Sequence, residues 1–133
     1  MNKGCPFCQI ADTHDHERII IENETAFVIR DAYPISAGHT LVIPRRHMGS
    51  FFGLSDQERA DLMSLLDRAR EQLLTEFSPD AFNVGINDGP AAGQTVPHLH
   101  IHLIPRYEGD VTDPRGGVRW IIPDKADYWS AGE

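Results

Sequence analysis

Short apolar runs separated by polar or glycine-rich segments recur along the chain and predict a set of antiparallel strands. Residues 18–21 (RIII) and 26–29 (AFVI) are apolar and largely β-branched, and the polar ENET between them is short, which predicts a β-hairpin. After a loop punctuated by proline and glycine, residues 40–44 (TLVIP) predict a third strand. Residues 81–87 (AFNVGIN) predict a fourth.

One long amphipathic helix is predicted between the third and fourth strands. Its start is marked by SDQE, in which Glu58 follows Ser55 by three residues and completes a capping box. The helix is expected to end near Phe77, because Ser78 precedes a proline and is biased away from helical backbone angles. Apolar residues at spacings of three and four define its buried face; they are Leu62, Leu65, Leu66, Ala69, Leu73 and Phe77.

Residues 97–106 (PHLHIHLIPR) alternate histidine with apolar residues and predict a fifth strand. His98, His100 and His102 are then expected on one face, about 6.8 Å apart. Five strands and one helix with short connections predict an α+β fold, an antiparallel five-stranded sheet that carries one long helix. Glycine, proline, aspartate and arginine are frequent in residues 107–133, for which a mostly irregular tail is expected.

The length and charge of the chain narrow the classes of function. The 133 residues fit a single domain, residues 1–133. A formal net charge of −8 with no basic stripe disfavours a nucleic-acid partner. No apolar run approaches the roughly 20 residues that span a bilayer, and the N-terminus lacks the apolar segment of a secretory signal. We therefore expect a cytoplasmic protein that binds neither nucleic acid nor membrane.

The two cysteines of the chain, Cys5 and Cys8, have C-x-x-C spacing. A structural disulfide is disfavoured in a cytoplasmic protein. A thioredoxin-like redox pair is also disfavoured, because the motif is expected to precede the first strand instead of opening a helix after a strand. Half of a zinc site is the favoured interpretation, provided that two more ligands lie elsewhere in the chain.

The alternating histidines allow three interpretations. They can form an ordinary solvated face, they can bind a metal through neutral imidazole, or one of them can attack phosphorus as a nucleophile. The loop of residues 87–98 (NDGPAAGQTVPH) leads directly to His98, and its small residues leave backbone N–H groups free to face an anion. The same loop is equally consistent with a tight connection between strands.

The segment HLHIHLI resembles the H-φ-H-φ-H-φ-φ pattern, with φ apolar, of the histidine-triad nucleotide hydrolases. CPFC, FVIRDAYPISAGHTLVIPRRH and NDGPAAGQTVPH are similar to segments of that family in the same order. GPAAGQTVPHLHIHLIPRYEGD is most similar to the fragile-histidine-triad and diadenosine polyphosphate hydrolase branch. CPFC and PRRH instead resemble the nucleoside phosphoramidase branch and bacterial members that bind zinc.

This resemblance implies an enzyme that attacks the α-phosphate of a purine nucleotide conjugate through a nucleotidyl-histidine intermediate. His100 would be the nucleophile, and His98, His102 and Gln94 would complete the catalytic set. His102 implies hydrolysis, since related nucleotidylyltransferases carry glutamine there. Asp31 would bind the ribose, although a turn aspartate is the simpler interpretation. The implied nucleotide-binding set comprises Phe7, Ile29, Asp31, Asn87, Gly93, Gln94, Thr95, His100 and His102, with core packing as the alternative for Phe7 and Ile29.

The resemblance also implies one zinc ion per chain, bound by Cys5, Cys8, His47 and His98, and no organic cofactor. It implies a homodimer in which the tail reaches the partner's site. An apolar arc on the helix widened by Ala60, Met63 and Leu74 is consistent with such contacts. Arg115 and Arg119 are candidates for binding a polyphosphate. The alternative function is a non-catalytic nucleotide- or zinc-binding module.

Overall fold

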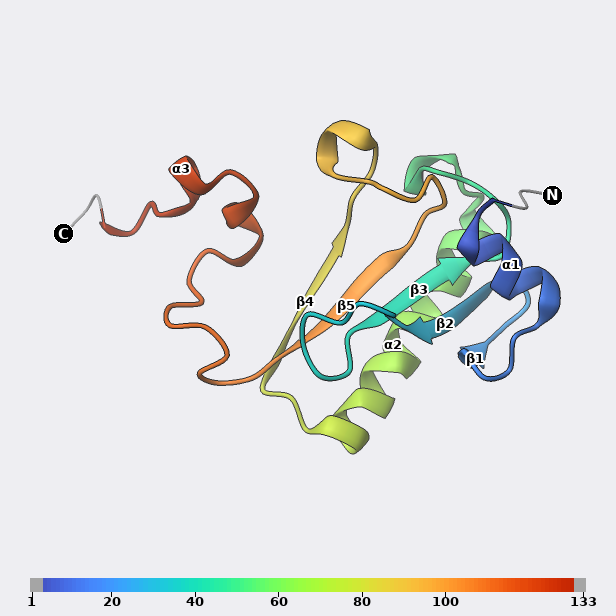
Figure 1. Cartoon of the computed structure of the whole chain (residues 1–133), viewed down its shortest axis with the longest axis horizontal. Helices are drawn as coiled ribbons and strands as arrows, with labels where there is room; N and C mark the ends of the chain where they lie inside the picture. Colours follow the sequence, from blue (N-terminus) through green and yellow to red (C-terminus); the bar gives the residue numbers. More distant parts are fainter. Residues whose placement is uncertain (1–3, 131–133) are drawn as a thin grey trace.

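A five-stranded antiparallel sheet forms the centre of the molecule, which we describe from a computed structural model over residues 4–130 (Figure 1). The first and last three residues of the expected domain lie outside this range. The strand order is β1-β2-β3-β5-β4. The strands are β1 (Ile19–Glu22), β2 (Ala26–Arg30), β3 (Thr40–Pro44), β4 (Ala81–Ile86) and β5 (Ile101–Arg106). The predicted α+β fold with one long helix is confirmed.

The long helix α2 (Asp56–Phe77) covers one face of the sheet (Figure 1). Both halves of the predicted capping box are present, and Ser78 ends the helix in the left-handed conformation with φ 51°. The apolar face of α2 packs against alternate residues of the histidine segment and against the central strands. Phe77 is an exception to the prediction, because it lies at the helix end and is 37% exposed.

The opposite face of the sheet carries α1 (Pro6–Thr13), a helix that the sequence analysis did not predict. Cys5 is its N-cap residue, and the buried side of the helix packs against β2 and β3. C-x-x-C therefore precedes the first strand, as expected, and the helix that it opens does not follow a strand. An eight-residue helix is marginal by itself, and packing of its apolar side chains on the sheet provides the stability that local sequence signals do not reveal.

The histidine segment enters the sheet later than predicted. β5 begins at Ile101, so that of the three alternating histidines only His102 lies within the strand. His98 is fully buried, and Leu99 is buried as well. A solvated histidine face is excluded, because the backbone before Ile101 turns one imidazole into the interior rather than continuing the alternation.

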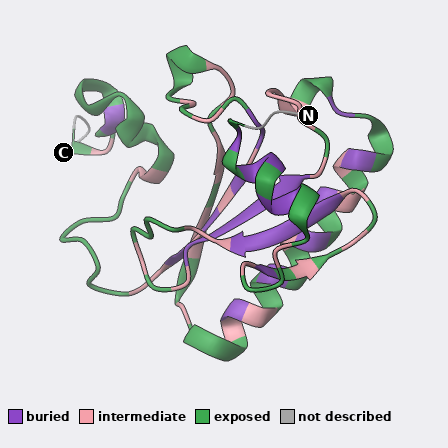
Figure 2. Ribbon diagram, turned by 45° about the vertical axis from the view of Figure 1, so that its right-hand side comes forward, coloured by how far each residue is buried: buried purple, intermediate pink, exposed green. Residues whose placement is uncertain are grey.

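Residues beyond β5 form an arm that extends past the edge of the sheet at β4 (Figures 1 and 2). Most of this arm is irregular, as predicted, but it also contains η3 (Gly117–Ile121) and α3 (Pro123–Ala126). Its residues are mainly exposed, whereas the buried residues concentrate in the sheet and the faces of α1 and α2 (Figure 2). Two further 3₁₀ turns are η1 (Phe51–Gly53) and η2 (Pro90–Ala92). Over residues 4–130, no helix combines the length and apolar character needed to cross a membrane.

Candidate functional site

A cavity of about 590 Å³ opens on the α1 side of the sheet and contains two of the three alternating histidines. α1, β2, the loop before β3, the loop after β4 and the histidine segment all contribute to its walls. The residues predicted for nucleotide binding that line it are Phe7, Ile29, Asp31, Asn87, Gly93, Thr95, His100 and His102. Tertiary folding therefore brings together most of the set that the sequence named.

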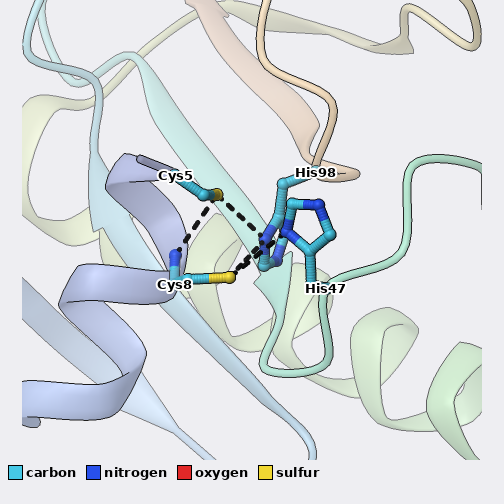
Figure 3. A group of neighbouring side chains, drawn as sticks. All are labelled: Cys5, Cys8, His47 and His98. Carbon is cyan, nitrogen blue, oxygen red and sulfur yellow. Dashed lines mark hydrogen bonds between the residues drawn. The ribbon is translucent and has the colours of Figure 1, made fainter. Parts of the chain in front are cut away.

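Behind this cavity, Cys5, Cys8, His47 and His98 converge on one point (Figure 3). Their ligand atoms all lie within 4.8 Å of one another. Nδ1 of His98 is 3.4 Å from Sγ of Cys5 and 3.5 Å from Sγ of Cys8, and Nδ1 of His47 is 3.2 Å from Sγ of Cys8. Two thiols and two imidazoles in this arrangement are a donor set suited to a tetrahedral metal ion.

The hydrogen bond at the far side of the His98 ring fixes which nitrogen faces the thiols. Nε2 of His98 lies 2.7 Å from the carbonyl oxygen of Pro44, which can only accept a hydrogen bond, so Nε2 carries the proton. The lone pair of Nδ1 is thereby directed towards Cys5 and Cys8. An outer hydrogen bond of this kind orients most histidine ligands of metals.

The segment that carries His47 is anchored to α2 through its neighbour Arg46. The Arg46 guanidinium donates hydrogen bonds of 3.0 and 2.9 Å to the two carboxylate oxygens of Glu58. These bonds, together with bonds from Ser55, lower the pKa of Glu58 to about 2 against the cost of burial. Glu58 thus closes the capping box of α2 and holds the turn in which His47 lies.

His100 is held by the main chain of His98 on one side and is open to the cavity on the other. Nδ1 of His100 lies 2.9 Å from the carbonyl oxygen of His98, so this nitrogen carries the proton and the lone pair of Nε2 remains available. The ring of Phe7 lies edge-on to both imidazoles, 5.1 Å from His100 and 5.7 Å from His98 between centroids. A neutral imidazole held in this way can act as a nucleophile.

A series of hydrogen bonds runs from the backbone N–H of Ile35 through His39 to His102. The N–H of Ile35 donates to Nδ1 of His39 (3.2 Å), so a neutral His39 carries its proton on Nε2. That proton is donated to Nδ1 of His102, 2.9 Å away, with Asp31 Oδ2 a more distant acceptor at 3.4 Å. A neutral His102 must then carry its own proton on Nε2, which makes that nitrogen a donor.

Burial keeps this pair of imidazoles neutral at ordinary pH. Burial first, and then the neighbouring His100 and His39, together lower the pKa of His102 to about 4, while Asp31 opposes the shift. Burial also lowers the pKa of His39, and again the Asp31 carboxylate opposes the shift. A site with neutral rings at pH 7 has both a free lone pair and an N–H donor.

The loop of residues 87–98 is braced against the turn that follows β3. Gln94, expected to contact phosphate, instead accepts a hydrogen bond from the N–H of Gly89 and donates one to the carbonyl of Gly49, each 2.8 Å long. Asp88 accepts hydrogen bonds from Ser50 and the N–H of Phe51. Gly89 and Gly93 have φ values of 103° and 95°, which other residues rarely adopt. The loop therefore has a defined shape before any ligand binds.

Other expected residues lie apart from the cavity. Arg115 pairs with Asp113 and stacks on Trp129, and Arg119 donates to carbonyl groups of the tail, so both stabilise the tail itself. Conversely, the sequence analysis missed His39. It lies in the segment SAGHTLVIP, eight residues after Asp31, and only the pairing of β3 with β5 places it beside His102.

In a comparison with known protein families, residues 13–109 match the HIT domain. The chain belongs to the HIT family. The predicted histidine-triad resemblance is therefore confirmed. The matched range contains the whole sheet, α2 and the three alternating histidines, whereas α1 lies mostly before it and η3 and α3 follow it.

Three HIT relatives show the range of the family. A bis(5'-adenosyl)-triphosphatase of Saccharomyces cerevisiae is 35% identical over 97% of this chain and 59% of its own length. An AP-4-A phosphorylase of Mycobacterium tuberculosis is 34% identical over 79% of this chain and 55% of its own. This chain thus spans little more than half of either. The crystal structure of a Zn-bound histidine triad family protein from Mycobacterium smegmatis matches 82% of this chain and 79% of its own, with 35% identity and a TM-score of 0.72.

The low pKa of His102 predicts a specific dependence of stability on pH. The unfolded chain takes up a proton at this ring below about pH 6.5, whereas the native protein does so only near pH 4. The stabilisation is therefore complete above pH 6.5 and is lost as the pH falls to 4, with a slope of up to about 1.4 kcal/mol per pH unit.

We expect the ring C–H resonance of His102 to titrate with a midpoint near pH 4. The variant His102→Gln should show a shallower decline of the unfolding free energy between pH 6.5 and 4. Urea unfolding across this range measures the slope. A His102 midpoint near 6.5, or an unchanged slope in the variant, would contradict the assignment of a buried neutral ring.

Proposed function

We propose that this HIT protein hydrolyses nucleotide conjugates by attack of His100 on the α-phosphate. The observation that carries the proposal is the pair of tautomers in the cavity: His100 presents a free Nε2 lone pair, and His102 presents an Nε2–H donor. Nucleophilic catalysis on phosphorus needs a basic nitrogen, and a hydrogen-bond donor to the departing group assists it. The alternative is a non-catalytic nucleotide- or zinc-binding module.

The reaction would proceed in two displacements. Nε2 of His100 forms a bond to phosphorus while the bond from phosphorus to the leaving group breaks, and the N–H of His102 donates a hydrogen bond to the leaving group, which departs as an anion or takes a proton from solvent. Water then attacks the nucleotidyl-histidine, the N–P bond breaks, and the proton of the attacking water passes to solvent. His39 is a positioning residue in this scheme, because its hydrogen bond sets the tautomer of His102.

The remaining walls of the cavity fit a nucleotide. Gly93 and Thr95 of the loop line the same cavity as His100, and their backbone N–H groups would bind phosphate oxygens. Asp31, which lines the cavity, would accept hydrogen bonds from ribose hydroxyls, and Phe7 and Ile29 would provide an apolar wall for the base. The Gln94 side chain would act indirectly, by holding the loop that faces the phosphate.

We favour dinucleoside polyphosphates as substrates over nucleoside phosphoramidates. The relatives that act on AP-4-A and on bis(5'-adenosyl) triphosphate support this choice. The two classes share the α-phosphate that His100 would attack and differ only in the leaving group. We propose that a purine nucleotide is the part that both substrate classes share. We also propose that the protein acts in the cytoplasm.

The variant His100→Ala separates the enzyme from the binding module. Without the attacking nitrogen, turnover should fall by about 10⁴-fold or more, whereas binding of a nucleoside monophosphate should persist. The measurements are hydrolysis of diadenosine polyphosphates and of adenosine phosphoramidates, with and without added phosphate, together with calorimetric binding. The matched control is His16→Ala, since His16 is exposed outside the cavity. Unchanged turnover in His100→Ala would refute the mechanism.

The residues of the metal cluster fit zinc. Two thiolates and two neutral imidazoles form a common structural set, and the hydrogen bond from His98 to Pro44 supplies the outer contact that such ligands need. Cys5 and Cys8 belong to α1, while His47 and His98 belong to the segments around β3 and β5. A bound zinc would therefore join α1 to the sheet, and its role would be structural.

Elemental analysis of the purified protein should find one zinc ion per chain. Removal by a chelator should lower the melting temperature by roughly 5–10 °C, because α1 loses its link to the sheet. The variant Cys8→Ser should bind less zinc and should show a smaller effect of the chelator. A metal-free protein with an unchanged melting temperature would rule out the structural role.

We also propose a homodimer in which β4 pairs with its symmetry mate. β4 is an edge strand with only β5 beside it, and Val84 is 48% exposed there. The arm beyond β4 exposes apolar residues that a second copy could cover; they are Val111, Val118, Trp120, Ile121, Ile122 and Tyr128. Unpaired edges of this kind are usually covered in soluble proteins.

Light scattering at micromolar concentration should give twice the 14.9 kDa mass of one chain. The variant Val84→Lys should shift this mass towards the monomer, because it places a charge on the paired edge. Ile20→Lys is the matched control, since Ile20 is 37% exposed on β1 at the other edge of the sheet. A monomeric wild-type protein would end the proposal.

A further inference from the structure

The C-x-x-C motif occupies the first turn of α1, an arrangement that favours redox chemistry as well as metal binding. Cys5 is the N-cap residue, and its Sγ accepts a hydrogen bond of 3.4 Å from the N–H of Cys8. The motif thus opens a helix, although this helix precedes β1 instead of following a strand as in thioredoxin-like redox pairs.

The two sulfur atoms are close enough to be joined. They lie within 4.8 Å of each other, and a disulfide requires about 2.05 Å, a change that side-chain rotation and a small shift of the first helical turn can supply. Each cysteine is 6% exposed, and hydrogen peroxide is little larger than water. Over residues 4–130 no disulfide is present, so both thiols are available for this reaction.

Two short series of contacts, here called routes, connect the two thiols with His100, the proposed nucleophile. The first passes through His98, whose ring faces both sulfurs and whose carbonyl oxygen holds Nδ1 of His100. The second passes through Phe7, which lies between Cys5 and Cys8 in the chain and contacts the rings of His98 and His100. A disulfide that reshapes the first turn of α1 would disturb both routes.

We propose that Cys5 and Cys8 are an oxidation site for peroxides, and that forming their disulfide releases zinc and lowers the reactivity of His100. One thiolate attacks hydrogen peroxide, which leaves a sulfenic acid and hydroxide, and the other thiolate displaces hydroxide from that sulfur. Two thiolates and one peroxide thus become one disulfide and two hydroxide ions, and the metal leaves because its sulfur ligands are gone. This inference rests on the proposed hydrolytic function and zinc site.

The test treats zinc-loaded, reduced protein with hydrogen peroxide and follows three quantities in parallel. We expect a mass loss of about 2 Da for one disulfide, release of one zinc ion per chain to a chromogenic chelator, and a fall in hydrolysis of about 10-fold or more. A thiol reductant with zinc should restore the rate. A disulfide with an unchanged rate would overturn the coupling, and retention of both thiols would overturn the oxidation site.

Two variants locate the effect. In the double variant Cys5→Ser/Cys8→Ser, peroxide should leave the residual rate unchanged, and an equal fall there would assign the effect to other residues. Met48→Leu is the control for methionine oxidation, because the carbonyl oxygen of Met48 accepts a hydrogen bond from the N–H of Leu99, next to His98, and it should retain the full peroxide response.

A failure of the proposed hydrolytic function can be distinguished from a failure of the proposed oxidation site. If reduced, zinc-loaded protein hydrolyses no substrate, mass and zinc release still test the oxidation site. The ring resonances of His100 then report the coupling, and they should shift on oxidation and return on reduction. Unshifted resonances in the oxidised protein would overturn it.

Discussion

His98 is fully buried, and its side chain and main chain serve two different sites. The imidazole joins the thiols of α1 to the end of β3, and the carbonyl oxygen accepts the hydrogen bond that orients His100. Nε2 of His98 lies 2.7 Å from the carbonyl oxygen of Pro44, and Nδ1 of His100 lies 2.9 Å from that of His98. Nδ1 of His98 lies 3.4 and 3.5 Å from the two sulfur atoms. The position of the candidate nucleophile and the integrity of the metal cluster therefore depend on the same few atoms.

Backbone groups set the tautomers of four of the imidazoles around the site. Carbonyl oxygens of Pro44 and His98 place protons on His98 and His100, and the N–H of Ile35 determines those of His39 and, through it, His102. Backbone groups have fixed donor or acceptor character at every pH. Burial also lowers the pKa of His39, His98 and His102, so the protonation pattern of these three rings is a property of the fold before any nucleotide arrives.

The order of strands in the sheet explains why these groups meet. β5 lies between β3 and β4, so the end of the histidine segment pairs with β3 on one side and with β4 on the other. Leu41 is opposite His102 in this register, which places His39 near the same ring. α2 fills the far face with apolar side chains, and this leaves the near face to α1 and the cavity.

The sequence by itself determined the strands, the capped helix and the family, since these depend on local periodicity, capping chemistry and motif spacing. It also named most residues of the cavity and all four of the metal cluster through resemblance to HIT proteins. Only the tertiary structure decided that C-x-x-C opens a helix, that β5 begins at Ile101, that Gln94 braces its own loop, and that His39 reaches His102. Each of these depends on packing or hydrogen bonding between segments distant in sequence, and no local pattern carries that information.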